Sequence, residues 1–262
     1  MLWDVTPTGP GEFEGVGEEG PRQRIFGGHV AAQALAAALA GLPDGWSARS
    51  LRARYVREGR GDTSVDYRVT PIGERHRAVT ASQAGRVILT LDVAFRFASF
   101  VAAPAPNGFD PAGWTASDDD AAAWLAEIDR RVPFDIRFDG RPASVAGRRG
   151  IPSGGHRFWL RTSSPLPDAP CQHECALTYV SDLLLVSTAL ARHGLAHNRP
   201  GVRAASLDHA VWFHPPFRVD DWLLYEQEAL TTDGGRGLCA GRLRDPGGRV
   251  VASVRQEVLL RS

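Results

Sequence analysis

The length, composition and charge of the chain restrict both its organisation and its partners. Its 262 residues suit one large domain or two of about 130. Thirty basic and thirty acidic residues give a formal net charge of zero, so no excess of positive charge favours nucleic acid or an anionic membrane surface. Apolar residues make up 43% of the chain, which is ample for a packed core.

The sequence gives no indication of export. Residues 1–5 lack the basic and apolar regions of a signal peptide, and no run approaches the roughly 18 apolar residues needed to span a bilayer. Cys171, Cys175 and Cys239 are an odd set for a disulfide framework. We therefore expect a cytoplasmic protein without a membrane partner.

The first predicted elements are a helix and a set of strands that follow it. Before them, residues 15–20 match the glycine spacing of dinucleotide-binding loops, but no strand–turn–helix context surrounds them and two Glu side chains would repel a pyrophosphate. We attribute that match to chance. The predicted helix covers residues 29–42, and the strands cover residues 50–57, 63–71, 78–83 and 86–97.

A region of different character comes next. Residues 98–113 are rich in Pro, Ala and Gly, which is typical of a linker. Residues 118–120 are all Asp and begin a predicted helix, where their negative charge suits the positive end of the helix dipole. Beyond this helix we expect strands at 132–138 and 157–163, with a mobile loop at 141–155.

The remaining segments repeat the order of the first ones. A long apolar helix is predicted over residues 177–193, followed by strands at 206–214, 222–231, 237–244 and 249–261. Leu51 and Leu207 are equivalent positions in the two copies, 156 residues apart. A helix followed by a meander of antiparallel strands, occurring twice, indicates an α+β unit duplicated in tandem.

The second apolar helix contains an unexpected carboxylate, Asp182. Apolar residues surround most of the helix circumference between 177 and 190, which is typical of a buried helix. An ionised carboxylate there needs hydrogen bonds or a partner charge. Asp182 therefore either lies at the solvated edge of the helix or caps a neighbouring turn, or it is a catalytic base in an apolar cleft. Aligning the two helices puts Ala31 opposite Asp182, so we expect one active site per chain.

Gln256 is a second polar residue on a predicted buried face. In the last strand it shares its parity with a row of apolar residues, while charged residues such as Arg255 take the other face. A buried amide needs partners, which local backbone would also provide. Two misplaced polar side chains nevertheless favour a shared polar site. Ser206 has an unclear parity in its strand and taken alone indicates a structural serine.

Four motifs resemble those of the type II acyl-CoA thioesterases, a TesB-like family with a double hotdog fold. They are Phe26-Gly27-Gly28-His29, Tyr179-Val180-Ser181-Asp182-Leu183, Ser206-Leu207-Asp208-His209-Ala210-Val211-Trp212-Phe213-His214 and the segment 251–257. The resemblance covers residues 20–262 and implies two antiparallel sheets, each wrapped around a long central helix. With the repeat, it divides the chain into an N-terminal hotdog at 1–97, a linker with a helix at 98–131, and a C-terminal hotdog at 132–262 that carries the active site.

The resemblance also implies a reaction and its residues. The Asp, Thr and Gln that activate water in this family match Asp182, Ser206 and Gln256; Ser in place of Thr departs from the family but retains the hydroxyl. The expected reaction is hydrolysis of an acyl-CoA thioester. It needs only an activated water and no cofactor, because a thiolate leaves readily. Asp182 would be the general base, and Ser206 and Gln256 would hold the water.

Substrate contacts are expected at the start of the first helix and in one loop. Backbone amides near a helix N-terminus suit a developing oxyanion, which makes Gly27, Gly28 and His29 candidates. His29 stands where the family commonly has Gln. Arg57, in the loop at residues 57–61, either offers charge for CoA phosphates or belongs to the solvated surface. Exposed sheet edges also favour a homo-oligomer.

Two other functions stay open. A hotdog hydratase or dehydratase needs an Asp and a His on either side of its substrate, and only Asp208 and His209 are available; neighbours in a strand point to opposite faces. A non-catalytic acyl-CoA binding protein would keep the pocket without turnover. The residues 171–175 collect Cys, His and Glu but lack the spacing of a zinc site, and the sequence has no Gly-x-Ser-x-Gly elbow.

Overall fold

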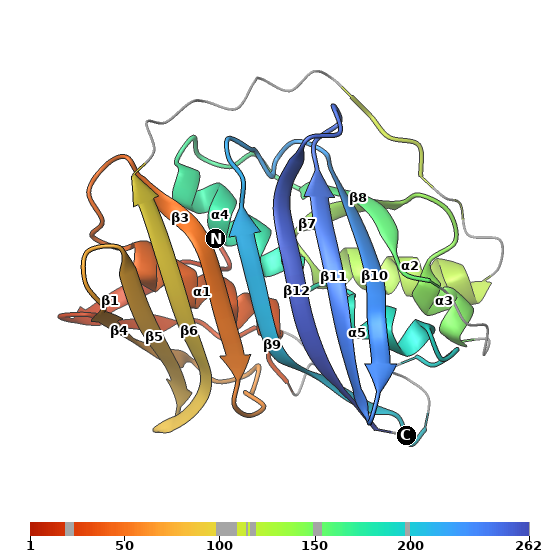
Figure 1. Ribbon diagram of the computed structural model, residues 1–262, viewed down its shortest axis with the longest axis horizontal. Coiled ribbons are helices and arrows are strands. Elements are labelled where there is room, and N and C mark those ends of the chain that lie inside the picture. Colours follow the sequence, from red (N-terminus) through yellow and green to blue (C-terminus); the bar gives the residue numbers. More distant parts are fainter. Residues whose placement is uncertain are drawn as a thin grey trace. The chain divides into compact units, whose positions relative to one another are not determined.

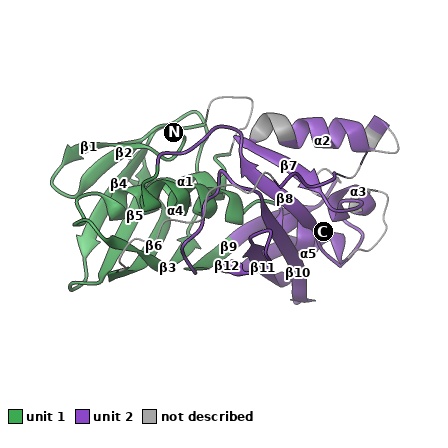
Figure 2. Ribbon diagram, turned by 90° about the horizontal axis from the view of Figure 1, so that it is seen from above, with its two compact units in different colours: residues 1–101, 168–183, 207–213 green, residues 102–167, 184–206, 214–262 purple. Residues whose placement is uncertain are grey.

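The computed structural model describes residues 1–18, 24–97, 109–113, 115, 119–148, 154–196 and 200–261. In these residues the strands pair antiparallel and helices are few (Figure 1). The chain forms two compact units that alternate along the sequence (Figure 2). Unit 1 comprises Met1–Val101, Asp168–Leu183 and Leu207–Phe213, and unit 2 comprises Ala102–Pro167, Leu184–Ser206 and His214–Ser262.

Unit 1 is a sheet covered by two helices. Its strand order is β1-β2-β4-β5-β6-β3-β9. The strands are β1 (Val5–Gly9), β2 (Glu12–Gly15), β3 (Trp46–Tyr55), β4 (Val65–Pro71), β5 (His76–Gln83), β6 (Arg86–Phe97) and the part of β9 (Arg203–Phe213) from residue 207 onward. Helix α1 (Gly27–Leu39) packs on this sheet and against α4 (Pro170–Ser181) (Figure 1). The small alanines of α1 are buried and allow this close packing.

In unit 2 a helix likewise packs on the strands. The strand order in this unit is β12-β11-β10-β8-β7. The strands are β7 (Phe134–Phe138), β8 (Arg157–Thr162), β10 (Leu223–Asp233), β11 (Arg236–Arg244) and β12 (Val250–Arg261), and the helices are α2 (Asp119–Arg131), α3 (Ala143–Arg148) and α5 (Leu185–Ala191). Helix α5 packs on β10, β11 and β12. Buried aromatic side chains, among them Phe138, Phe158 and Tyr225, form the core beside it.

The prediction of one helix over residues 177–193 is wrong. The structure has two helices, and the residues between them include Asp182, which caps α4, and Leu184, whose φ of 65° lies in the left-handed region. A left-handed residue cannot continue a right-handed helix. By length and composition alone the segment Pro170–Ala191 would suffice to cross a membrane, but 83% of its most apolar window is buried in the protein, as in a core helix.

Most predicted strands are confirmed, with shifts of a few residues at their ends. The expected loop at 141–155 is partly wrong, because α3 lies within it, and residues 149–153 of that loop lie outside the described residues. The same holds for residues 98–108 of the expected linker and for 19–20 of the glycine-rich stretch. The division into hotdogs at 97 and 132 stays a prediction.

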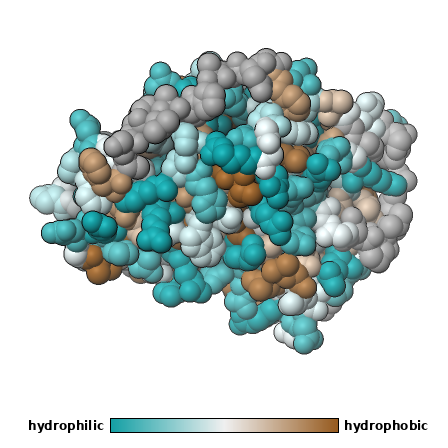
Figure 3. Space-filling view, turned by 45° about the horizontal axis from the view of Figure 1, so that its top comes forward, coloured by the Kyte–Doolittle hydropathy of each residue, from teal (hydrophilic) through white to brown (hydrophobic). Residues whose placement is uncertain are grey.

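Polar and apolar residues are interspersed on the face shown in Figure 3. Large apolar side chains that are exposed come from separate elements, including Ile72 after β4, Trp212 on β9 and Leu238 on β11. Scattered apolar residues of this kind are ordinary for a protein surface.

Candidate active site

Asp182 is buried beside the start of helix α1. Its side chain is 5% exposed, so it does not lie at a solvated edge. A Cβ added to Gly27 would lie 2.7 Å from Asp182 Oδ2. The residue caps the C-terminal end of α4, where the helix dipole disfavours negative charge. The positive end of α1 lies next to the carboxylate and favours that charge, since Gly27 is the first residue of α1.

Two glycines permit this approach of α1 to α4. A Cβ at Gly28 would lie 2.2 Å from the Tyr179 carbonyl oxygen, closer than any carbon can approach. Only glycine therefore fits at Gly28 without moving the helices apart. The first amides of a helix have no acceptor within the helix itself. The Gly27-Gly28 pair thus brings donor groups of α1 to the end of α4 where Asp182 lies.

His209 holds the last turn of α4 from the β9 side. Its Nε2 lies 2.7 Å from Ser181 Oγ, and both residues are fully buried. Ser181 Oγ donates to the Thr178 carbonyl oxygen at 2.9 Å, so the imidazole Nε2–H is the donor in the contact with Ser181. His209 is thus a packed, hydrogen-bonded histidine. This contact fixes the residue that immediately precedes Asp182.

Asp208 and His209 have separate partners, as alternation along a strand predicts. Arg52 Nη2 donates to Asp208 Oδ2 at 2.9 Å in an exposed ion pair, whereas His209 is bonded to buried Ser181. A hydratase needs both groups on one substrate. The geometry of this Asp–His pair therefore disfavours that chemistry.

Ser206 and Gln256 are brought together. Gln256 is fully buried on β12, which confirms the prediction that it faces the core. Its Nε2 donates to Ser206 Oγ at 3.0 Å. Strict alternation along β9 would group Ser206 with Asp208, away from the side of buried His209. The hydrogen bond shows instead that the Ser206 hydroxyl reaches a buried amide. Both residues belong to unit 2 and Asp182 to unit 1, and a site formed by all three stays a prediction.

His29, predicted as a substrate contact, is fully buried within unit 1. Its Nε2 lies 3.0 Å from the Val16 carbonyl oxygen, and Glu18 Oε2 accepts a hydrogen bond from the Phe26 amide at 3.0 Å. Burial lowers the pKa of His29 below its usual value, against the opposing effects of Val16 and Glu18. These contacts tie residues 16–18 to the start of α1. A contact of His29 with substrate stays a prediction.

Arg57 is exposed after the end of β3. Its Nη1 donates a hydrogen bond to the Val87 carbonyl oxygen at 2.6 Å. This backbone contact orients the guanidinium group. Its proposed role toward CoA phosphates stays a prediction.

Glu174 is a buried carboxyl that the sequence did not reveal. Its two oxygens accept from the Ala48 amide at 3.0 and 3.1 Å, which ties α4 to β3. Burial raises the pKa of this carboxyl to about 8, although the Ala48 hydrogen bond and the Arg96 charge oppose the rise. The predicted helix began at residue 177 and did not include Glu174. The sequence therefore offered no reason to expect this carboxyl to be buried. Among the described residues no group of three or more His, Cys, Asp or Glu side chains is arranged to hold a metal.

Tyr55 is the second residue that the sequence did not single out. It lies at the end of β3 with the same parity as buried Leu51 and Ala53, and that parity was the available signal. Its ring carbon Cε1 would lie 2.9 Å from a Cβ on Gly27. Burial raises the pKa of the Tyr55 hydroxyl well above its usual value, and the charges of Asp182 and Asp208 add to the rise.

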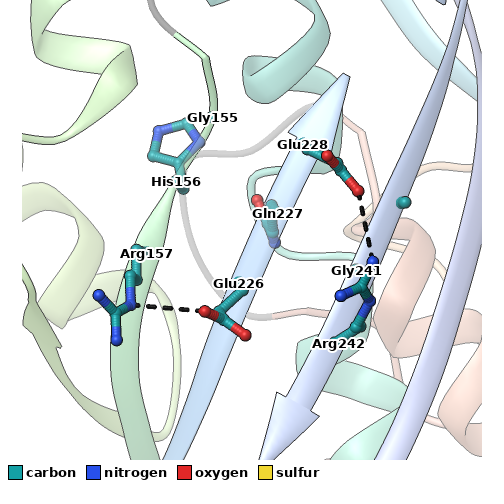
Figure 4. Close-up of a pocket in the computed structure, with 9 residues that line it drawn as sticks. Gly155, His156, Arg157, Glu226, Gln227, Glu228, Gly241 and Arg242 are labelled. Atoms are coloured by element: carbon teal, nitrogen blue, oxygen red, sulfur yellow. Dashed lines mark ion pairs between the residues drawn. The ribbon is translucent and has the colours of Figure 1, made fainter. Parts of the chain in front are cut away.

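Unit 2 has a pocket of about 370 Å³ lined by residues 155–157, 226–228 and 240–242 (Figure 4). Its charged side chains face one another: Arg157 pairs with Glu226 at 3.6 Å and Arg242 with Glu228 at 3.7 Å (Figure 4). His156, at its edge, is buried in a hydrogen-bonded network. The residues of this network are Ser144, His156, Thr188 and Gln227. Burial lowers the pKa of His156 to about 3, so its ring is neutral and structural.

Known proteins are similar to this chain in fold and in sequence. A family model described as the acyl-CoA thioesterase C-terminal domain matches residues 102–260. Acyl-coenzyme A thioesterase 8 of Rattus norvegicus is 30% identical over 92% of this chain and 81% of its own length. The crystal structure of acyl-CoA thioesterase II TesB2 from Mycobacterium marinum is 31% identical, with a TM-score of 0.75 over 99% of this chain and 95% of that one.

A structure from Alicyclobacillus acidocaldarius, described as having a hot dog fold, is 17% identical with a TM-score of 0.71 over 100% of this chain and 97% of that one. At that identity only the fold is shared. The class is therefore that of hotdog-fold thioesterases, with a mostly antiparallel sheet and few helices. Within this class, the chain belongs to the TesB-like acyl-CoA thioesterase family.

Proposed function

We propose that this protein hydrolyses acyl-CoA thioesters to a free acid and CoA, using water activated by Asp182. The reaction class follows from family membership. The observation that carries the mechanism is the burial of the Asp182 carboxylate beside the glycines that begin α1. A buried carboxylate next to helix amides places a general base beside hydrogen-bond donors for an oxyanion.

The proposed reaction proceeds through a tetrahedral intermediate. Asp182 accepts a proton from water, and the water oxygen forms a bond to the thioester carbonyl carbon. The carbonyl oxygen becomes an oxyanion that the amides of Gly27 and Gly28 stabilise. When the intermediate collapses, the carbon–sulfur bond breaks, and the departing thiolate receives the proton from Asp182. A base placed within reach of water contributes about 10²–10⁴-fold to the rate.

Ser206 and Gln256 are proposed to orient the water for Asp182. The hydrogen bond from Gln256 Nε2 fixes the position of Ser206 Oγ. Strand β9 is continuous from Ser206 to His209, and His209 is bonded to the residue before Asp182. This continuity supports a common site. The serine hydroxyl replaces the family's threonine hydroxyl without loss of the polar group.

We also propose the tandem double hotdog, with one hotdog at 1–97, a linker and helix at 98–131, and the second hotdog at 132–262. Each unit has helices packed on its own strands, which supports this architecture. The site is single because Ala31 occupies the place in α1 that corresponds to Asp182. Exposed strand edges favour a homo-oligomer.

The function is tested with a panel of acyl-CoAs of increasing chain length. Thiol release is followed with a thiol-reactive chromophore, and the acid product is measured separately. We expect one thiol and one acid for each thioester consumed. Tight binding of every acyl-CoA without thiol release would instead establish the non-catalytic binding protein. Conversion of an enoyl-CoA to a hydroxyacyl-CoA without thiol release would establish the hydratase.

A further inference from the structure

The hydroxyl group of Tyr55 is buried without a hydrogen-bond partner among the described residues. The ring itself is half-buried at the end of β3. Buried polar atoms are nearly always hydrogen-bonded, because an unmade bond costs stability. An unpartnered hydroxyl in a native protein therefore requires an explanation.

Tyr67 shows how a structural tyrosine is accommodated in the same unit. It is also buried, and its hydroxyl donates to Gln33 Oε1 at 2.7 Å. Gln33 in turn donates to the Val16 carbonyl oxygen at 3.1 Å. Tyr67 thus belongs to a connected polar network within the core, whereas Tyr55 lacks such a contact in the described part of the chain.

Tyr55 lies beside two residues that take part in the proposed reaction, Gly27 and Asp182. A Cβ on Gly27 would lie 2.9 Å from Tyr55 Cε1, 3.0 Å from Tyr55 Cζ and 2.7 Å from Asp182 Oδ2. The aromatic ring and the carboxylate therefore converge on the first residue of α1. Burial and the nearby charge of Asp182 raise the pKa of the phenol, so it stays protonated at neutral pH and acts as a donor.

The reaction determines which substrate atom a donor would serve. The attacking water gives its proton to Asp182, and a donor to the water oxygen would reduce its nucleophilicity. The sulfur is a weak acceptor and leaves readily as thiolate. The carbonyl oxygen gains a full negative charge, and donors placed there act mainly on the transition state.

We propose that the Tyr55 hydroxyl donates a hydrogen bond to the carbonyl oxygen of the acyl thioester and stabilises the oxyanion that forms on it. The inference rests on the proposed thioesterase function. It makes Tyr55 a catalytic residue that acts together with the amides at the start of α1. The substrate then makes the hydrogen bond that the hydroxyl does not make to any of the described residues.

Tyr55→Phe tests the proposal, because it removes only the hydroxyl. One oxyanion donor is worth about 10²–10³-fold in kcat, so we expect a decrease of that order with KM changed by no more than a few-fold. The Tm is expected to stay unchanged or rise, since an unsatisfied buried group has been removed. Tyr67→Phe is the matched control: its Tm falls because the bond to Gln33 is lost, while kcat stays within a few-fold of the unaltered protein.

A binding experiment tests the same contact without turnover. In a ketone analogue of acyl-CoA a methylene replaces the sulfur and the carbonyl is kept; in a thioether analogue a methylene replaces the carbonyl. We expect Tyr55→Phe to weaken binding of the ketone analogue by a few-fold, in line with KM, and to leave that of the thioether analogue unchanged. Equal effects on both analogues, or a Tyr55→Phe kcat within about threefold of the unaltered protein, would overturn the role of Tyr55. An unaltered protein that releases no thiol would instead overturn the thioesterase function.

Discussion

The hydrogen bond from Gln256 to Ser206 is the residue contact on which the water-holding role depends. The donor is an amide with no exposed surface, and the acceptor is a serine hydroxyl at 3.0 Å. If both side chains hold one water, they act as a unit, and their effects on the rate are not additive.

We therefore expect Ser206→Ala and Gln256→Ala each to lower kcat by about 10²-fold, and the double variant to be little worse than either. Ser206→Thr keeps the hydroxyl and is expected to stay within a few-fold of the unaltered protein. The measurement is steady-state kcat on one acyl-CoA for all four variants. A double variant whose loss equals the product of the single losses would show that the two residues act independently.

At this scale, burial patterns in the sequence revealed some of the site residues and missed others. Gln256 was found because a polar residue interrupts an apolar row in a strand. The position of Ser206 depends on a hydrogen bond between distant segments, which alternation along β9 does not predict. Tyr55 has the parity of buried neighbours, but a tyrosine on a core face is common, and only the absence of a partner for its hydroxyl among the described residues made it unusual.

At the scale of elements, the interruption between α4 and α5 puts Asp182 at a helix end instead of a helix middle. The left-handed backbone of Leu184 makes this interruption. Residues 177–193 around it are mostly apolar and contain no Gly or Pro, so neither of the usual signals of a helix end was present. The predicted strands were more accurate because alternation and Gly-rich turns mark their ends.

Replacing Leu184 by Gly and by Ala tests this interruption. In a helix Gly is less stable than Ala by about 1 kcal/mol. In the left-handed region the order reverses, because a Cβ costs roughly 1–2 kcal/mol there. We expect Leu184→Gly to have the higher free energy of unfolding, measured by urea denaturation. A more stable Leu184→Ala would show that the helix is continuous through residue 184.

At the scale of the whole molecule, the sequence predicts a duplicated helix and meander, and the structure has helices packed on strands in each unit. Which segments belong to which unit was not visible. Residues 168–183 and 207–213 lie with the N-terminal segment in unit 1, although they come after the linker. Such interleaving depends on packing between distant segments, such as α1 against α4, and local patterns in sequence carry little information on it.

The central claim is that Asp182 is the base that activates water, and Asp182→Asn tests it most directly. Asn retains the shape of the side chain and removes the basic oxygen. With the Tm as a control for folding, we expect kcat for acyl-CoA hydrolysis to fall by about 10²–10⁴-fold with little change in KM. A folded Asp182→Asn protein that hydrolyses acyl-CoA within a few-fold of the unaltered rate would contradict the account.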